Sequence, residues 1–152
     1  MTDKKYLSEK SSPCVGYCST TYGDDYCRGC YRSAFCVINW TTKTQDEKDL
    51  TYQNIAKFVA QATAEYWDVT NEVQLLNALT KHHLFFPRNR TLRSVYYELY
   101  QLTQCGVDPC ALYPKYVSWK KPVTNATAFM KSLSKMIYDR LCAQNGESYA
   151  FS

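Results

Sequence analysis

Two close pairs of cysteines near the N-terminus constrain this chain more than any other feature. Cys14 and Cys18 form the first pair and Cys27 and Cys30 the second, in the spacing C-x3-C-x8-C-x2-C. Each pair can supply two thiolates from one tight turn, and the spacer, which contains the turn-forming sequence Gly-Asp-Asp, lets the pairs face each other. The pattern therefore predicts that these four cysteines bind one tetrahedral metal centre.

The residues alone leave the identity of the metal open. Zinc favours closed four-cysteine sites in short loops, whereas iron–sulfur clusters also take four cysteines and often have a proline, such as Pro13, beside a ligand. Two disulfides are the alternative without metal. The N-terminal residues lack the apolar segment of a secretory signal, which predicts a cytoplasmic protein. In that reducing compartment, clustered cysteines bind metal more often than they form disulfides.

The cysteine segment also resembles a known family. The residues that carry the resemblance are Pro13, Cys14, Cys18, Cys27, Gly29, Cys30, Arg32, Ile38 and Trp40. They are similar to the pattern of the DUF1289 family, over roughly residues 12–60. Members of that family are small bacterial proteins usually described as predicted iron–sulfur proteins, so the resemblance implies a cysteine-bound metal centre. It implies no activity, and it does not extend to the residues that follow.

The fold expected from the sequence is all-α, with a small four-cysteine metal knuckle docked on a bundle of about four helices. We expect a flexible tail over residues 1–12, the metal knuckle with a short helix over residues 13–42, and a helical domain over residues 43–152. In the knuckle, Phe35 and Ile38, with Trp40, are expected to cover the metal.

Caps and apolar periodicity predict the helices of the third segment. Thr44 and Glu47 form a capping box, and Thr70 or Asn71 can cap the next helix. The expected helices, each given by its cap and its approximate last residue, are 44–67, 70–83, 91–104 and 124–145. A short helical turn is expected after Asp108. No stretch has a pattern typical of a strand.

The charge is distributed unevenly along the chain. The net charge is +4, but residues 81–140 carry 10 Lys or Arg and 3 Asp or Glu, a balance of +7. Basic groups neutralise phosphates, and aromatic rings stack on unpaired bases. The residues predicted to bind an anion are Arg88, Arg90, Arg93, Lys120, Lys121, Tyr97 and Tyr100. The expected partner is RNA or another single-stranded nucleic acid, or an acidic protein, and a solvated basic surface is the alternative.

Other patterns of functional residues are weak or missing from the sequence. There is no Ser/His/Asp order, no paired carboxylates in an apolar segment and no glycine-rich phosphate loop, which favours a protein that is not an enzyme. No apolar run is long enough to predict a membrane span. Cys105 and Cys110 could form a second metal site with His82 or His83, and Cys36 and Cys142 are expected to be buried.

The expected function is therefore a non-enzymatic metal-binding module with a basic, aromatic helical part that binds an anionic partner. Two alternatives stay open. One is an iron–sulfur protein that transfers electrons, and the other is an accessory subunit of a larger enzyme.

Overall fold

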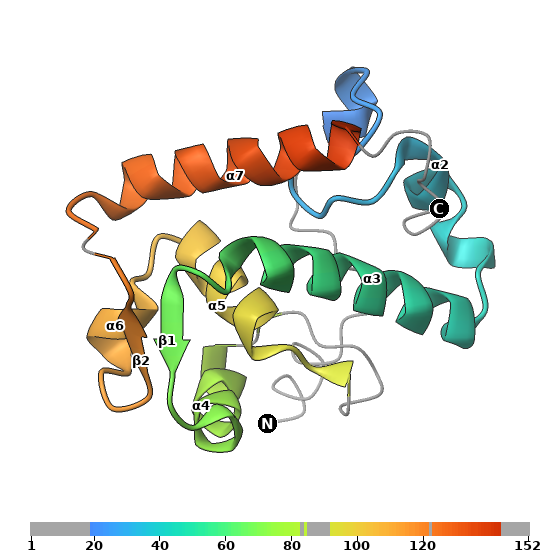
Figure 1. Cartoon of the computed structure of the whole chain (residues 1–152). Helices are drawn as coiled ribbons and strands as arrows, with labels where there is room; N and C mark the ends of the chain where they lie inside the picture. The colour runs from blue at the N-terminus through green and yellow to red at the C-terminus, as the bar shows by residue number, and fades with distance from the viewer. Residues whose placement is uncertain (1–18, 83, 85–91, 122, 144–152) are drawn as a thin grey trace.

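The computed structural model describes residues 19–82, 84, 92–121 and 123–143, and most of these residues are helical. Helix α3, Gln45–Thr63, packs along helix α5, Val95–Gln104. Helix α7, Ala126–Ala143, lies along one side of this pair (Figure 1). Helix α4, Glu72–Leu79, packs on α5 on the side away from α7. The described chain is mostly helical, which confirms the predicted fold class in its coarse form.

The predicted caps begin most of these helices. The Thr44 hydroxyl accepts a hydrogen bond from the Glu47 backbone N–H, and the Glu47 carboxylate accepts one from the Thr44 N–H, at 3.2 and 2.8 Å. Asn71 caps α4, and the side chain of Asn125 accepts from the Ala128 N–H at the start of α7. Side chains of this kind satisfy backbone N–H groups that have no partner inside the helix.

Helix α5 begins later than predicted. Its cap is Ser94, and its first residue is Val95 rather than one next to Thr91, which lies outside the described residues. The predicted end is correct, because Gly106 has a φ of +86° just beyond Gln104. Only glycine adopts that conformation without steric cost, so it suits the end of a helix.

The expectation of no strands was wrong. Strand β1, Trp67–Val69, pairs antiparallel with strand β2, Val117–Trp119, so that Trp67 lies opposite Trp119. The two indole rings lie 5.5 Å apart, and Trp67 is fully buried. Strands of three residues are too short to show the alternation of apolar and polar residues that predicts a strand. The cross-strand contact packs the buried Trp67 ring against the half-buried Trp119 ring, which favours their pairing.

Helix α6, Pro109–Leu112, precedes β2 and begins at the predicted Asp108 cap. The core lies between α3, α4, α5 and α7 and is unusually rich in tyrosine. Tyr52 of α3 and Tyr97 of α5 make an edge-to-face contact across it at 5.5 Å. Both are buried, together with Ile55, Leu79 and Leu99.

The first described segment, drawn from blue to cyan in Figure 1, begins beside the C-terminal end of α7 and leads to the start of α3. It contains a 3₁₀ turn, Ser19–Tyr22, the short helix α2, Ala34–Ile38, and a second 3₁₀ turn, Trp40–Thr42. The prediction that Phe35 and Ile38 cover the metal was wrong, because they are 66% and 78% exposed. Cys36 and Trp40 face inward from this segment instead.

Candidate metal centre

The second cysteine pair lies in a tight loop below the surface. Cys27 and Cys30 are each about 1% exposed, and Cys14 and Cys18 lie outside the described residues. The Cys27 N–H donates to the Arg32 carbonyl at 2.8 Å, and the Tyr31 N–H donates to the Cys27 carbonyl at 2.7 Å. These two bonds close the loop and hold both thiols within it.

Tyr31 has a backbone conformation that tyrosine rarely adopts. Its φ is +65°, and it is the one residue other than glycine with positive φ in the described part of the chain. For a residue with a side chain this conformation costs roughly 1–2 kcal/mol. The turn immediately after Cys30 reverses the chain direction, which lets the backbone of residues 29–31 curl around the Cys27 sulfur.

Backbone N–H groups surround that sulfur. The Gly29 N–H donates to Cys27 Sγ at 3.4 Å, and the N–H groups of Cys30 and Ser19 act on the same atom. N–H groups that point at a sulfur stabilise a thiolate more than a thiol. The loop therefore provides the environment that a metal-bound thiolate requires.

Cys27 and Cys30 interact through their side chains, and the interaction shifts their pKa values in opposite directions. The pKa of Cys27 falls to about 4, mainly because the Cys30 thiol donates to its sulfur, with the backbone N–H groups adding to the effect and burial opposing it. The pKa of Cys30 is raised, first by that same hydrogen bond and then by burial, while the Arg32 charge lowers it. A pair of this kind titrates as a unit. Its first deprotonation is favoured, and a cation is needed to favour the second.

Arg32 places a positive charge next to this pair. Its side chain is buried, Nε lies 3.3 Å from Cys30 Sγ, and the guanidinium lies 4.8 Å from the centre of the Trp40 ring. Among the described residues, no carboxylate lies within ion-pair distance of it. A buried guanidinium is costly unless an anion compensates its charge. The sulfur of Cys30 is the group positioned to be that anion.

The loop is attached to the helices through two tyrosines. Arg28 lies between the two cysteines, and its guanidinium is 3.9 Å from the centre of the Tyr138 ring on α7. The Tyr31 hydroxyl is hydrogen-bonded to the Tyr100 hydroxyl on α5, which is 3.1 Å from the Ser134 hydroxyl on α7. The position of the cysteine loop is thus fixed by contacts to both helices.

The donor set fits a metal centre bound by thiolates. Two sulfurs are buried side by side, N–H groups surround one of them, and a guanidinium lies against the other. The described residues contain no group of three or more His, Cys, Asp or Glu placed to hold a metal ion. Two of the four predicted ligands lie in this part of the chain, and Cys14 and Cys18 would supply the remaining two.

Residues 12–58 match the model of a family described as "Protein of unknown function (DUF1289)". The match confirms the resemblance that the cysteine pattern indicated, and it covers the described loop, α2 and most of α3. No curated protein and no solved structure matches the chain. No helix in the described part of the chain has the length and apolar character needed to span a membrane.

The other described cysteines, which are free thiols, are Cys36, Cys105, Cys110 and Cys142. Cys36 is buried as predicted, whereas Cys142 is exposed, contrary to the prediction. For the second predicted site, His82 Nε2 lies 2.5 Å from the Tyr113 hydroxyl, while Cys105 is exposed at the end of α5. No group of metal ligands forms there within the described residues.

The predicted anion-binding residues do not form one surface. Arg93 is bound by the Glu98 carboxylate through Nε and Nη2 at 2.8 and 2.6 Å, and it also donates to the Leu76 carbonyl. Tyr97 and Tyr100 are 3% and 0% exposed, so their rings pack in the core and have no face available for a base. We therefore correct the assignment of these three residues.

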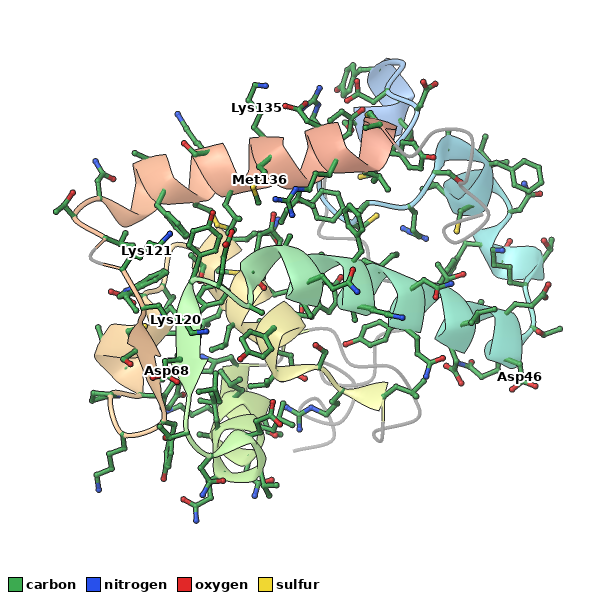
Figure 2. The ribbon with its side chains drawn as sticks, viewed as in Figure 1. Asp46, Asp68, Lys120, Lys121, Lys135 and Met136 are labelled. Atoms are coloured by element: carbon green, nitrogen blue, oxygen red, sulfur yellow. The ribbon has the colours of Figure 1, made fainter. Side chains whose placement is uncertain are left out.

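The other predicted anion-binding residues are basic. Lys120 and Lys121 are exposed at the end of β2, where Figure 2 shows both, and Arg88 and Arg90 lie outside the described residues. Arg93 immediately precedes the Ser94 cap of α5, so it lies next to the first turn, which contains Glu98.

Proposed function

We propose that this chain is a non-enzymatic metal-binding protein in which Cys14, Cys18, Cys27 and Cys30 hold one structural metal centre. The observation that carries the proposal is the buried guanidinium of Arg32, 3.3 Å from Cys30 Sγ, where no carboxylate of the described residues compensates its charge. A metal bound by four thiolates is anionic overall and balances such a charge. Without a metal, burial and the hydrogen bond to Cys27 raise the pKa of Cys30, so the sulfur next to the guanidinium keeps its proton.

The proposed centre would hold the N-terminal segment in place. The loop contributes few apolar side chains of its own, so the free energy of metal binding would supply much of its folding free energy. The bound metal supplies a cross-link between the two cysteine pairs. The contact of Arg28 with Tyr138 would then hold the cysteine loop against α7, and the contact of Tyr31 with Tyr100 would hold it against α5.

An iron–sulfur centre that transfers electrons is the second candidate function. It is supported by the hydrogen bond from the Gly29 N–H to Cys27 Sγ and by the contact of Arg32 with Cys30 Sγ. Hydrogen bonds and positive charge at cluster sulfurs tune the reduction potential. Zinc and iron–sulfur centres both fit the donors, and the visible absorption of anaerobically purified protein distinguishes them, since zinc protein is colourless.

We also propose that the helical part binds an anionic partner. The support is the excess of basic residues over residues 81–140 and the exposure of Lys120, Lys121, Lys131 and Lys135. Such a basic surface attracts anionic partners over distances of about a Debye length. Because Tyr97 and Tyr100 are buried, neither of the two predicted rings is available to stack on a base.

Single cysteine substitutions test the metal centre. Cys14→Ser, Cys18→Ser, Cys27→Ser and Cys30→Ser are each expected to lower the metal content per chain severalfold, because each removes one of four ligands. Cys105→Ser and Cys142→Ser are the matched controls, since both thiols are exposed. Hydrogen exchange should accelerate over residues 19–43 in the ligand variants and stay slow in α5. Full metal content in Cys27→Ser would contradict the proposed ligands.

A further inference from the structure

A groove with a volume of about 570 Å³ lies between the end of α5, one stripe of α7 and the cysteine loop. The α7 residues that line it are spaced by three or four positions and therefore share one face of the helix. They are Thr127, Met130, Lys131, Ser134, Lys135 and Tyr138. At a rise of 1.5 Å per residue this stripe is roughly 16 Å long. The groove is long enough for a segment of another chain.

The charge of the groove is one-sided. Arg28, Lys131 and Lys135 line it, and no acidic residue does so among the described residues. Lys131 has no ion-pair partner in the described part of the chain. Figure 2 shows Lys135 projecting from the side of α7 that faces away from α3.

Two of the three cations have acidic neighbours on the surface. Lys135 pairs with Asp139 at 2.7 Å and Arg28 with Asp24 at 3.1 Å, and all four side chains are at least 30% exposed. Exposed pairs of this kind are weak because water and salt screen them. An incoming carboxylate can therefore compete with Asp139 and Asp24 for the two cations.

The remaining lining residues distinguish a peptide from a nucleic acid. Met130 and Val107 provide apolar surface, and Thr103, Gln104 and Ser134 provide hydroxyl and amide groups for hydrogen bonds. Methionine adapts its shape and is common on surfaces that bind amphipathic helices.

A base would lack a stacking partner in this groove. Tyr138 is the one aromatic residue among those that line it, it is 8% exposed, and the Arg28 guanidinium covers its ring. Single-stranded nucleic acids gain much of their affinity from bases stacked on exposed aromatic rings. The lining therefore favours acidic and apolar side chains over phosphates and bases.

We propose that this groove binds an acidic, amphipathic segment of a partner protein, with its apolar side chains on Met130 and Val107 and its carboxylates at Lys131, Lys135 and Arg28. The inference rests on the proposed anionic partner and names its class and its site. Because Arg28 lies between Cys27 and Cys30, the cysteine loop forms one end of the groove. The proposed metal centre is therefore contiguous with the groove, and any effect of metal binding on peptide affinity would equal the effect of peptide binding on metal affinity.

The test measures binding of a fluorescein-labelled peptide by fluorescence anisotropy, using the full, metal-loaded chain. The probe is a peptide of about twelve residues with Leu and Glu on opposite sides of a helix. We expect saturable binding that weakens about tenfold in the variant Lys131→Ala/Lys135→Ala, because two exposed cations are lost. Lys57→Ala/Lys115→Ala removes the same charge at exposed positions outside the groove and should change the affinity by less than about twofold.

Three further arms decide the inference. A peptide with Gln in place of Glu should bind weakly. Met130→Gln should weaken binding of the acidic peptide severalfold, which a purely electrostatic attraction does not predict.

Equal loss of affinity in both lysine pairs would overturn the groove as the site. Binding of a single-stranded RNA probe in place of the peptide would overturn the class of partner while leaving the proposed anionic partner intact. Absence of binding to both probes would overturn both, and the metal content is measured independently.

Discussion

The Nε atom of Arg32 lies 3.3 Å from the sulfur of Cys30, and both side chains are buried. A positive charge next to a buried sulfur is stable when that sulfur is a thiolate. The distance links a cationic residue of the segment that matches the DUF1289 model to the proposed metal centre, in which Arg32 would support the ligands without being one.

Arg32→Met is expected to weaken metal binding roughly 10- to 100-fold, the usual effect of removing a residue that orients and balances a ligand. Methionine keeps most of the buried volume and removes the charge. Arg32→Lys is the matched control and should retain more of the affinity, although it loses the flat contact with the Trp40 ring. Competition with a chromophoric chelator measures both variants. Equal affinity for Arg32→Met and the unchanged chain would contradict this role of the charge.

The hydrogen bond between Tyr31 and Tyr100 is expected to couple the cysteine loop to α5. Tyr31→Phe and Tyr100→Phe should each lower the free energy of unfolding by about 1 kcal/mol. Because both remove the same bond, the double variant should cost less than the sum of the two single variants, by about 0.5–1.5 kcal/mol. Urea unfolding of the metal-loaded protein measures this. Strictly additive costs would mean that the bond contributes nothing.

Stability should depend on pH through Glu98. Burial raises the pKa of Glu98 to about 7, although Arg93 opposes the shift. A raised folded-state pKa means that the folded chain binds a proton more tightly than the unfolded chain, in which the pKa of Glu is about 4.3. The contribution to stability is therefore fully present below about pH 4 and is lost as the pH rises through about 7.

The size of the Glu98 effect is on the order of 1–3 kcal/mol between pH 5 and pH 8. Thermal unfolding of the wild-type chain and of Glu98→Gln across this range measures it. The substitution should flatten the pH profile below about pH 7, because the amide does not titrate. An unchanged profile in Glu98→Gln would assign the dependence to another group.

Arg93 should behave as a structural residue and not as an anion-binding residue. Arg93→Ala leaves the Glu98 carboxylate buried without its partner, so a loss of about 3–5 kcal/mol in the free energy of unfolding is expected. Arg93→Ala/Glu98→Ala removes both charges and should recover part of that loss. Peptide binding to the folded fraction should stay unchanged in both variants. If Arg93→Ala lost peptide binding without losing stability, Arg93 would be an anion-binding residue after all.

Local chemistry made the helix starts predictable. Thr44, Asn71 and Asp108 each satisfy a backbone N–H close by in the chain, so their role is visible without knowledge of the fold. The cysteine pairs are predictable for the same reason, because the spacing within each pair is short. The DUF1289 match lies on this part of the chain.

Burial was less predictable, because it depends on what packs around an element. Tyr97 and Tyr100 lie on α5, where Tyr97 contacts Tyr52 of α3 and Tyr100 contacts Ser134 of α7, so both rings are buried. Phe35 and Ile38 lie on a helix of five residues, where periodicity cannot define a buried face. The basic groove was missed because its cations come from two segments far apart in the sequence, Arg28 of the loop and the stripe of α7.

X-ray absorption at the edge of the bound metal, on anaerobically purified protein, tests the four-cysteine centre most directly. Its fine structure counts the ligand atoms and measures their distances. We predict a first shell of four sulfurs and no nitrogen or oxygen, at about 2.3 Å if the metal is zinc. An iron–sulfur centre would add a second shell of iron. A first shell containing nitrogen or oxygen, or protein purified without metal, would contradict the proposed centre.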